Sequence, residues 1–196
     1  DTAAIGGGVG TYMPEMMGDS LVMGRVDHFG FHNYAGDSGG ADAAIKGSLY
    51  PTKNFWITEV TNSWYILTHL SQGPAAVLVW DAYDAVYNHA VLAGRGSTPP
   101  NDVGNGPPLI AYNTGSKTYS ARKGFYECAQ IFRYIAPGSV RISATEFSAP
   151  LTVYAFHHGA TGVLTIVGRN ENGSSIPLDG TFANLSVAGP FQLYET

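Results

Sequence analysis

Residues 54–59 read Asn-Phe-Trp-Ile-Thr-Glu, a short apolar run that ends in a carboxylate. Aromatic and β-branched residues favour the half-buried surface of a sheet, so the run predicts a β-strand from Phe55 to Val60. Glu59 then lies at the C-terminal tip of that strand. In sheets of parallel strands, this is the edge where chemically active side chains gather. Glu59 is therefore the first candidate for a functional residue.

Two similar runs flank this strand and also end in chemically capable side chains. Residues 26–34 predict a strand before it, and residues 75–80 (Ala-Ala-Val-Leu-Val-Trp) predict a strand after it. If the three strands are parallel, their C-terminal ends meet on one rim. The candidates that this rim would collect, besides Glu59, are His32, Tyr34, Trp80 and Asp81.

Helix-like stretches separate the three predicted strands. Short helices are expected within residues 12–23 and 41–47, and a further one at 64–71. Alternation of short apolar strands with helices is typical of βα units and a parallel sheet. Trp64 follows the strand of Glu59 after three residues, which makes it a further candidate for lining the same rim.

The second half of the chain has a different pattern. Residues 94–117 are rich in Pro, Gly and Asn and predict a long loop, and residues 119–135 have apolar side chains at helical spacing. Ala136-Pro137-Gly138 should end that helix. Short strands are then expected at 140–147, 151–157, 162–167, 174–178 and 191–194, a spacing typical of an antiparallel β-sandwich. The predicted fold is a partial (half) TIM (β/α) barrel over residues 1–137, followed by a small β-sandwich over residues 138–196.

Composition narrows the class of protein. Hydrophobic residues make up 44% of the 196 residues and charged residues 13%, which is typical of a globular chain and argues against disorder. The net charge of −5 gives no reason to expect nucleic acid or a membrane as a partner. Cys128 is the single cysteine, so no internal disulfide is possible, and a plain buried thiol is expected. No signal peptide or initiator Met is present, and the chain looks like a mature or truncated protein.

The ordered set of motifs resembles the clan A retaining glycoside hydrolases, most closely family 30. The motifs are His32-Asn33-Tyr34, Trp56-Ile57-Thr58-Glu59, Val79-Trp80 and the passage Ile135-Ala136-Pro137-Gly138. The resemblance covers residues 26–196. It implies that the chain holds strands six to eight of the barrel and the β-sandwich side domain, which makes it the C-terminal half of such an enzyme.

The resemblance also implies roles for individual residues. Glu59 matches the nucleophile, His32 and Tyr34 match the polar groups that orient it, and Trp80 matches the aromatic floor of the neighbouring sugar subsite. Trp64 and Asp81 would lie close to the same substrate. The implied reaction is retaining hydrolysis of a β-linked polysaccharide by two carboxylates, with no cofactor and no metal. The implied location of the parent protein is secreted or at the cell envelope.

One part of the family pattern is missing. The acid/base glutamate of the clan follows an Asn, and no Asn-Glu pair precedes Glu59 here. Glu15 is the one glutamate before Glu59, and it is a weak candidate for the acid/base because it sits beside Pro14 rather than at a strand end. A homo-oligomer or a complementing N-terminal half is therefore expected to complete the site and to cover the open barrel.

Two other functions remain open from the sequence. The chain could be a non-catalytic half-barrel that binds glycan through Trp80 or self-associates. The stretch Gly18-Asp19-Ser20-Leu21 spells the signature of GDSL-type esterases, with Ser20 as nucleophile. A four-residue match is weak evidence, and the Asp-x-x-His that would supply the base does not occur.

Overall fold

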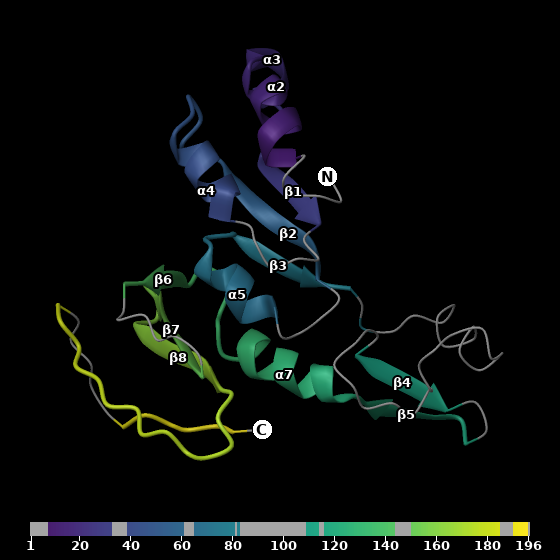
Figure 1. The fold of residues 1–196 in the computed structure, drawn as a ribbon, viewed down its shortest axis with the longest axis vertical. Coiled ribbons are helices and arrows are strands. Elements are labelled where there is room, and N and C mark those ends of the chain that lie inside the picture. Colours follow the sequence, from purple (N-terminus) through teal and green to yellow (C-terminus); the bar gives the residue numbers. More distant parts are fainter. Residues whose placement is uncertain are drawn as a thin grey trace. The chain divides into compact units, whose positions relative to one another are not determined.

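The computed structural model describes residues 8–32, 39–60, 65–80, 82, 109–113, 116–143, 150–184 and 190–195. The chain divides into two compact units, Asp1–Cys128 and Ala129–Thr196. The division lies inside helix α7 (Lys123–Phe132), whereas the sequence placed a domain boundary at 137–138. Figure 1 labels most of the helices and strands and colours them along the chain.

The first unit contains a three-stranded parallel sheet, as the sequence predicted. Its strands are β1 (His28–His32), β2 (Asn54–Val60) and β3 (Ala76–Val79). They are ordered β1-β2-β3, and β2 pairs in parallel with both neighbours. The carboxyl ends of the three strands therefore lie side by side at one edge of the sheet.

Helices precede and separate the strands. They are η1 (Gly8–Tyr12), α2 (Met13–Met17), α3 (Ser20–Met23), α4 (Gly39–Lys46) and α5 (Tyr65–Ser71). The predicted helix at 12–23 is broken because Gly18 ends α2 and Asp19 starts α3 as its N-cap. The Asp19 side chain accepts hydrogen bonds from the backbone amides of Leu21 and Val22, which satisfies donors that the first helical turn leaves free.

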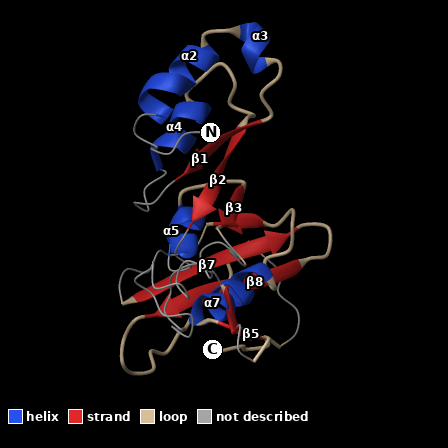
Figure 2. Ribbon diagram, turned by 90° about the vertical axis from the view of Figure 1, so that its right-hand side faces the viewer, coloured by secondary structure: helices blue, strands red, loops and turns tan. Residues whose placement is uncertain are grey.

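One face of the parallel sheet is buried by helices. Phe29 and Phe31 of β1 pair with Phe55 and Ile57 of β2, and all four are buried. Helices α4 and α5 both contact β2 and lie beside the sheet in Figure 2. They add further buried side chains to this core, namely Ala41, Ile45, Ile66, Leu67 and His69. The residues between these buried positions on each strand point to the opposite face of the sheet.

The predicted loop at 94–117 and the start of the predicted helix at 119–135 were both wrong in part. Strands β4 (Ile110–Asn113) and β5 (Thr118–Ala121) form an antiparallel hairpin. Helix α7 begins only at Lys123 and ends at Phe132. Ladder hydrogen bonds to β4 hold residues 118–121 extended, so pairing between segments overrides the local helical spacing.

The second unit contains a three-stranded antiparallel sheet. Strands β6 (Val140–Ile142), β7 (Leu151–His158) and β8 (Val163–Asn170) are ordered β6-β7-β8. The predicted strands at 174–178 and 191–194 were wrong, because both segments are irregular. Pro177 lies in the first and Pro190 precedes the second, and each lacks the amide that a ladder requires. Among the described residues this unit therefore has one sheet layer.

Aromatic pairs hold the irregular C-terminal segment of the second unit. The rings of Tyr134 and Tyr194 stack with centroids 4.6 Å apart, and those of Phe182 and Phe191 stack at 5.7 Å. Thr165 of β8 donates a hydrogen bond from its hydroxyl to the backbone carbonyl of Tyr134. The two aromatic pairs thus contact the C-terminal segment, whose described residues are in no strand.

Candidate functional site at the edge of the parallel sheet

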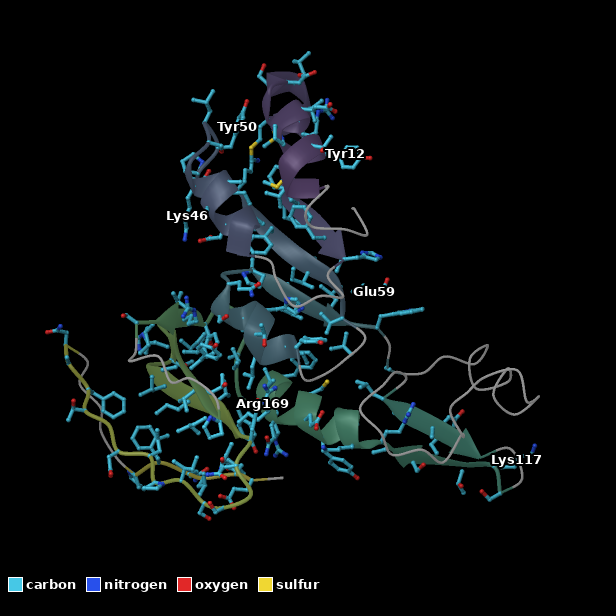
Figure 3. All side chains as sticks on the ribbon, in the orientation of Figure 1. Tyr12, Lys46, Tyr50, Glu59, Lys117 and Arg169 are labelled. Atoms are coloured by element: carbon cyan, nitrogen blue, oxygen red, sulfur yellow. The ribbon has the colours of Figure 1, made fainter. Side chains whose placement is uncertain are left out.

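The structure brings His32 and Glu59 into direct contact. They are the partnered residues at the ends of β1 and β2, and Nε2 of His32 lies 2.8 Å from Oε2 of Glu59. The side chain of His32 is 25% exposed and that of Glu59 is 16% exposed, so both remain reachable from solvent. Figure 3 shows Glu59 at the tip of β2. A charge-assisted hydrogen bond of this length fixes the direction of the carboxylate.

An irregularity in β2 lies beneath this contact. Phe31 pairs with Ile57, but the next residue of β1, His32, pairs with Glu59 and passes over Thr58. On the other side, Ile57 pairs with Val77 while Val60 pairs with Val79. Strand β2 thus carries one extra residue relative to both neighbours, as in a β-bulge, a feature that is rare in parallel pairs and frequent beside active sites.

The bulge decides which way Glu59 points. Regular alternation would place Glu59 in phase with Phe55 and Ile57, which are buried on the helix-covered face. The extra residue shifts that phase, so Val60 is buried instead, at 1% exposure. Thr58 and Glu59 are both partly exposed between the two buried positions. An acidic side chain is thereby kept out of the apolar core, where an ionised carboxylate is costly.

Thr58 joins the site as the second partner of the histidine. Its Oγ1 lies 3.1 Å from Nδ1 of His32. One imidazole therefore contacts a hydroxyl with one nitrogen and the carboxylate with the other. The sequence prediction did not single out Thr58. Its position next to Glu59 was visible, but regular alternation would have placed it on the opposite face from that residue.

Trp80 directly follows β3 at the same edge. Its backbone amide donates a hydrogen bond of 2.9 Å to the carbonyl of Val60, which ties it to the end of β2. Its side chain is 49% exposed, whereas a core indole would be buried. Leu78, which precedes it on the same face, is 41% exposed. The edge therefore offers a flat aromatic surface on the strand next to that of Glu59.

Of the other residues predicted for the glycosidase site, the structure describes Glu15 alone, and Glu15 does not join this group. Glu15 is exposed on α2. Helices α2 and α3 lead into the start of β1, the end of the sheet opposite Glu59 (Figure 1). Tyr34, Trp64 and Asp81 lie outside the described residues.

Ser20 of the esterase-like stretch is exposed in the first turn of α3. It follows helix α2 and not a buried strand, and its neighbour Asp19 serves as the helix cap. Within the described part of the chain, no three His, Cys, Asp or Glu side chains are grouped so that they could hold a metal ion. No described helix has both the length and the apolar character needed to cross a membrane.

The geometry of Glu59 suits nucleophilic or general-base chemistry. Glu59 offers a carboxylate that is aimed by a hydrogen bond, partly accessible, and set at the carboxyl edge of a parallel sheet. Such a group can attack an electrophilic carbon or accept a proton. A half-exposed indole on the adjacent strand can stack against an apolar face of a ligand.

Comparison with known proteins supports the fold. No family model and no curated protein matches the sequence. The structure of SrfJ from Salmonella typhimurium is similar, with a TM-score of 0.65 and 16% identity over 88% of this chain. A GH30 endoxylanase from Clostridium papyrosolvens C71 matches 74% of this chain with 20% identity and a TM-score of 0.48. The chain spans 39% of the length of SrfJ and 34% of that of the endoxylanase. The chain therefore shares its fold with part of SrfJ.

Proposed function

We propose that this chain carries the nucleophile half of a retaining β-glycoside hydrolase, with Glu59 as the nucleophile. The observation that supports this most is the contact between His32 Nε2 and Glu59 Oε2 at the carboxyl edge of the parallel sheet. The motif resemblance assigns the same residue the same role. Under this proposal β1, β2 and β3 are the last three strands of a half barrel, and the second unit is its sandwich-like side domain.

The reaction is a double displacement. A Glu59 oxygen attacks the anomeric carbon of a β-linked sugar, and the bond to the leaving oxygen breaks to give a glycosyl-enzyme ester. Water then hydrolyses that ester and returns the carboxylate. His32 donates a hydrogen bond to one oxygen of Glu59 and so leaves the other aimed at the substrate. Trp80 forms the floor on which the sugar ring stacks.

A second carboxylate is needed about 5 Å from the nucleophile to protonate the leaving group. Glu15 does not suit this role, because α2 leads toward the opposite end of the sheet. We assign the acid/base to a complementing N-terminal half or to a second copy of the chain. The exposed apolar face at Leu78 and Trp80 is where such a partner would complete the barrel, since parallel sheets are normally covered on both faces.

The test is a panel of aryl β-glycosides with the wild-type chain, Glu59→Gln and the matched control Glu15→Gln. Activated aryl leaving groups need little protonation, so the wild-type chain should turn over at least one of them without a second carboxylate. Turnover should vanish with Glu59→Gln and persist with Glu15→Gln. A well-folded wild-type chain that releases no aryl alcohol from any sugar would reject the proposal.

The alternative is a non-catalytic module that binds glycan or self-associates. The exposure of Trp80 and Leu78 favours it, since both functions need an accessible apolar surface. In that case Trp80→Ala should abolish polysaccharide binding in affinity electrophoresis, while Glu59→Gln should leave binding unchanged. Light scattering at tens of micromolar separates the self-associating form, because it should reveal a dimer or larger species.

A further inference from the structure

We infer that Thr58 is a positioning residue that fixes the protonation pattern of His32, and through it the aim of Glu59. The inference deepens the proposed function and rests on it for its catalytic consequence. The arrangement that carries it is a chain of three side chains, Thr58 Oγ1 to His32 Nδ1 at 3.1 Å and His32 Nε2 to Glu59 Oε2 at 2.8 Å.

The chemistry of a neutral imidazole allows one consistent arrangement. One ring nitrogen carries a proton and the other carries a lone pair. If Nδ1 held the proton, the lone pair of Nε2 would face a carboxylate oxygen, which is repulsive. With the proton on Nε2, the ring donates to Glu59, and Nδ1 becomes an acceptor. A hydroxyl can donate to that acceptor, and Thr58 supplies one.

The β2 bulge makes this chain possible. On a regular strand, consecutive residues point to opposite faces, so Thr58 and Glu59 could not both reach the same imidazole. The register passes over Thr58 and pairs His32 with Glu59, and both β2 side chains then contact the ring. The extra residue thus lets the orienting hydroxyl of Thr58 and the reacting carboxylate of Glu59, both on β2, contact the imidazole of His32 on β1.

The first experiment reads the protonation pattern directly and needs no substrate. Long-range ¹H–¹⁵N correlation spectra of the full chain would be recorded at about pH 8, above the ordinary pKa of histidine. The His32 signals would be assigned by their loss in His32→Gln. Nδ1 should appear as an unprotonated, hydrogen-bonded nitrogen and Nε2 as the protonated one. A ring protonated on Nδ1, or on both nitrogens, would overturn the inference.

Variants of Thr58 then test whether its hydroxyl, and not the rest of the surroundings of His32, determines the Nδ1 signal. Thr58→Val keeps the shape and removes the hydroxyl, so the Nδ1 signal should move toward the value of a free acceptor nitrogen. Thr58→Ser restores a hydroxyl and should return the signal. An Nδ1 signal that is identical in the wild type and in Thr58→Val would also overturn the inference. If Thr58→Val fails to fold, the wild-type spectrum still decides the case.

The catalytic consequence is measured on the aryl glycoside that the wild type turns over. Loss of one hydrogen bond to a positioning group should lower kcat about three- to tenfold with KM little changed, and Thr58→Ser should recover most of it. Unchanged kcat in Thr58→Val would refute the positioning role. Loss of turnover in Glu59→Gln tests the proposed function, and it does not depend on Thr58. The spectra test the role of Thr58, and they need no turnover. Failure of the proposed function can therefore be distinguished from failure of this inference.

Discussion

Nε2 of His32 lies 2.8 Å from Oε2 of Glu59 across two adjacent parallel strands. The pair defines the candidate site, because it couples a carboxylate to a donor at the edge where three strands end. A purely structural ion pair and a pair that orients a nucleophile can have the same distance. They differ in whether removal of the donor lowers activity.

Replacing His32 with Phe should keep an aromatic ring at this position and remove the donor to Glu59. Because hydrogen bonds to charged groups contribute about 1.5–3 kcal/mol, kcat/KM on an aryl glycoside should fall about 10- to 100-fold. His32→Gln returns an amide donor and should recover part of the loss. Equal rates for the Phe variant and the wild type would show that the histidine does not act on the nucleophile.

The bulge in β2 predicts that removing its extra residue should lower activity while changing stability little. Deleting Thr58 gives β2 a regular alternation that still buries Phe55, Ile57 and Val60, so urea unfolding should change by about 1 kcal/mol or less. Activity on aryl glycosides should fall at least about three- to tenfold, the loss expected from Thr58→Val, because the hydroxyl that contacts Nδ1 of His32 is removed.

The matched control inserts one Ala between Glu59 and Val60. Val60 can then remain buried only if Glu59 enters the helix-covered face, which should cost about 3–5 kcal/mol for an uncompensated charge. The interpretation of the bulge would be wrong if the deletion destabilised the chain as much as the insertion does.

The parallel sheet was predictable from sequence because its signals are local. Apolar runs punctuated by Gly and Pro located β1, β2 and β3, and their order placed His32, Glu59 and Trp80 on one edge. The bulge was not predictable, because it appears only in the register between strands. Thr58 was missed for the same reason.

The second half of the chain shows where local sequence patterns fail to predict secondary structure. Tyr119 was placed at the start of a helix, but it lies in β5 and pairs with β4 in a hairpin. The helical spacing further along the chain hid the ladder that holds residues 118–121 extended. The segments 174–178 and 191–194 have apolar residues typical of strands, yet the first includes a proline, the second follows one, and neither is a strand in the structure.

The second unit has a close contact between the paired strands β7 and β8, and this contact yields a stability prediction. A Cβ at Gly168 of β8 would lie 2.6 Å from the backbone carbonyl oxygen of Thr152 and 3.1 Å from a methyl of Val153. Gly168→Ala should therefore destabilise the unit by about 1–3 kcal/mol in thermal or urea unfolding. Gly173→Ala is the control, since nothing lies within 4 Å of its Cβ, and it should be near neutral. Similar melting of the two variants would contradict the packing of β7 on β8.

Cys128 makes a prediction about pH and reactivity. It is 2% exposed on α7, and burial raises the pKa of its thiol from 9.0 to about 11. The folded chain should react slowly with iodoacetamide near pH 8 and rapidly in urea, because the thiolate is the reactive form.

The same shift has a stability consequence. The pKa of the thiol is higher in the folded chain than in the unfolded chain. The contribution of Cys128 to the free energy of unfolding is therefore fully present below pH 9 and is lost as pH rises from 9 to about 11. Cys128→Ala should flatten that part of the stability profile. Rapid labelling of the native chain would show that the thiol is not buried.

Trapping of the glycosyl-enzyme tests the central claim most directly. The chain would be incubated with 2-deoxy-2-fluoro-β-glycosides that carry a dinitrophenyl leaving group, followed by intact-mass measurement and peptide mapping. Formation of the ester needs the nucleophile and no acid, so the account predicts one added sugar on Glu59 and none in Glu59→Gln. A folded chain that stays unlabelled by every sugar tested, or a label on another carboxylate, would contradict it.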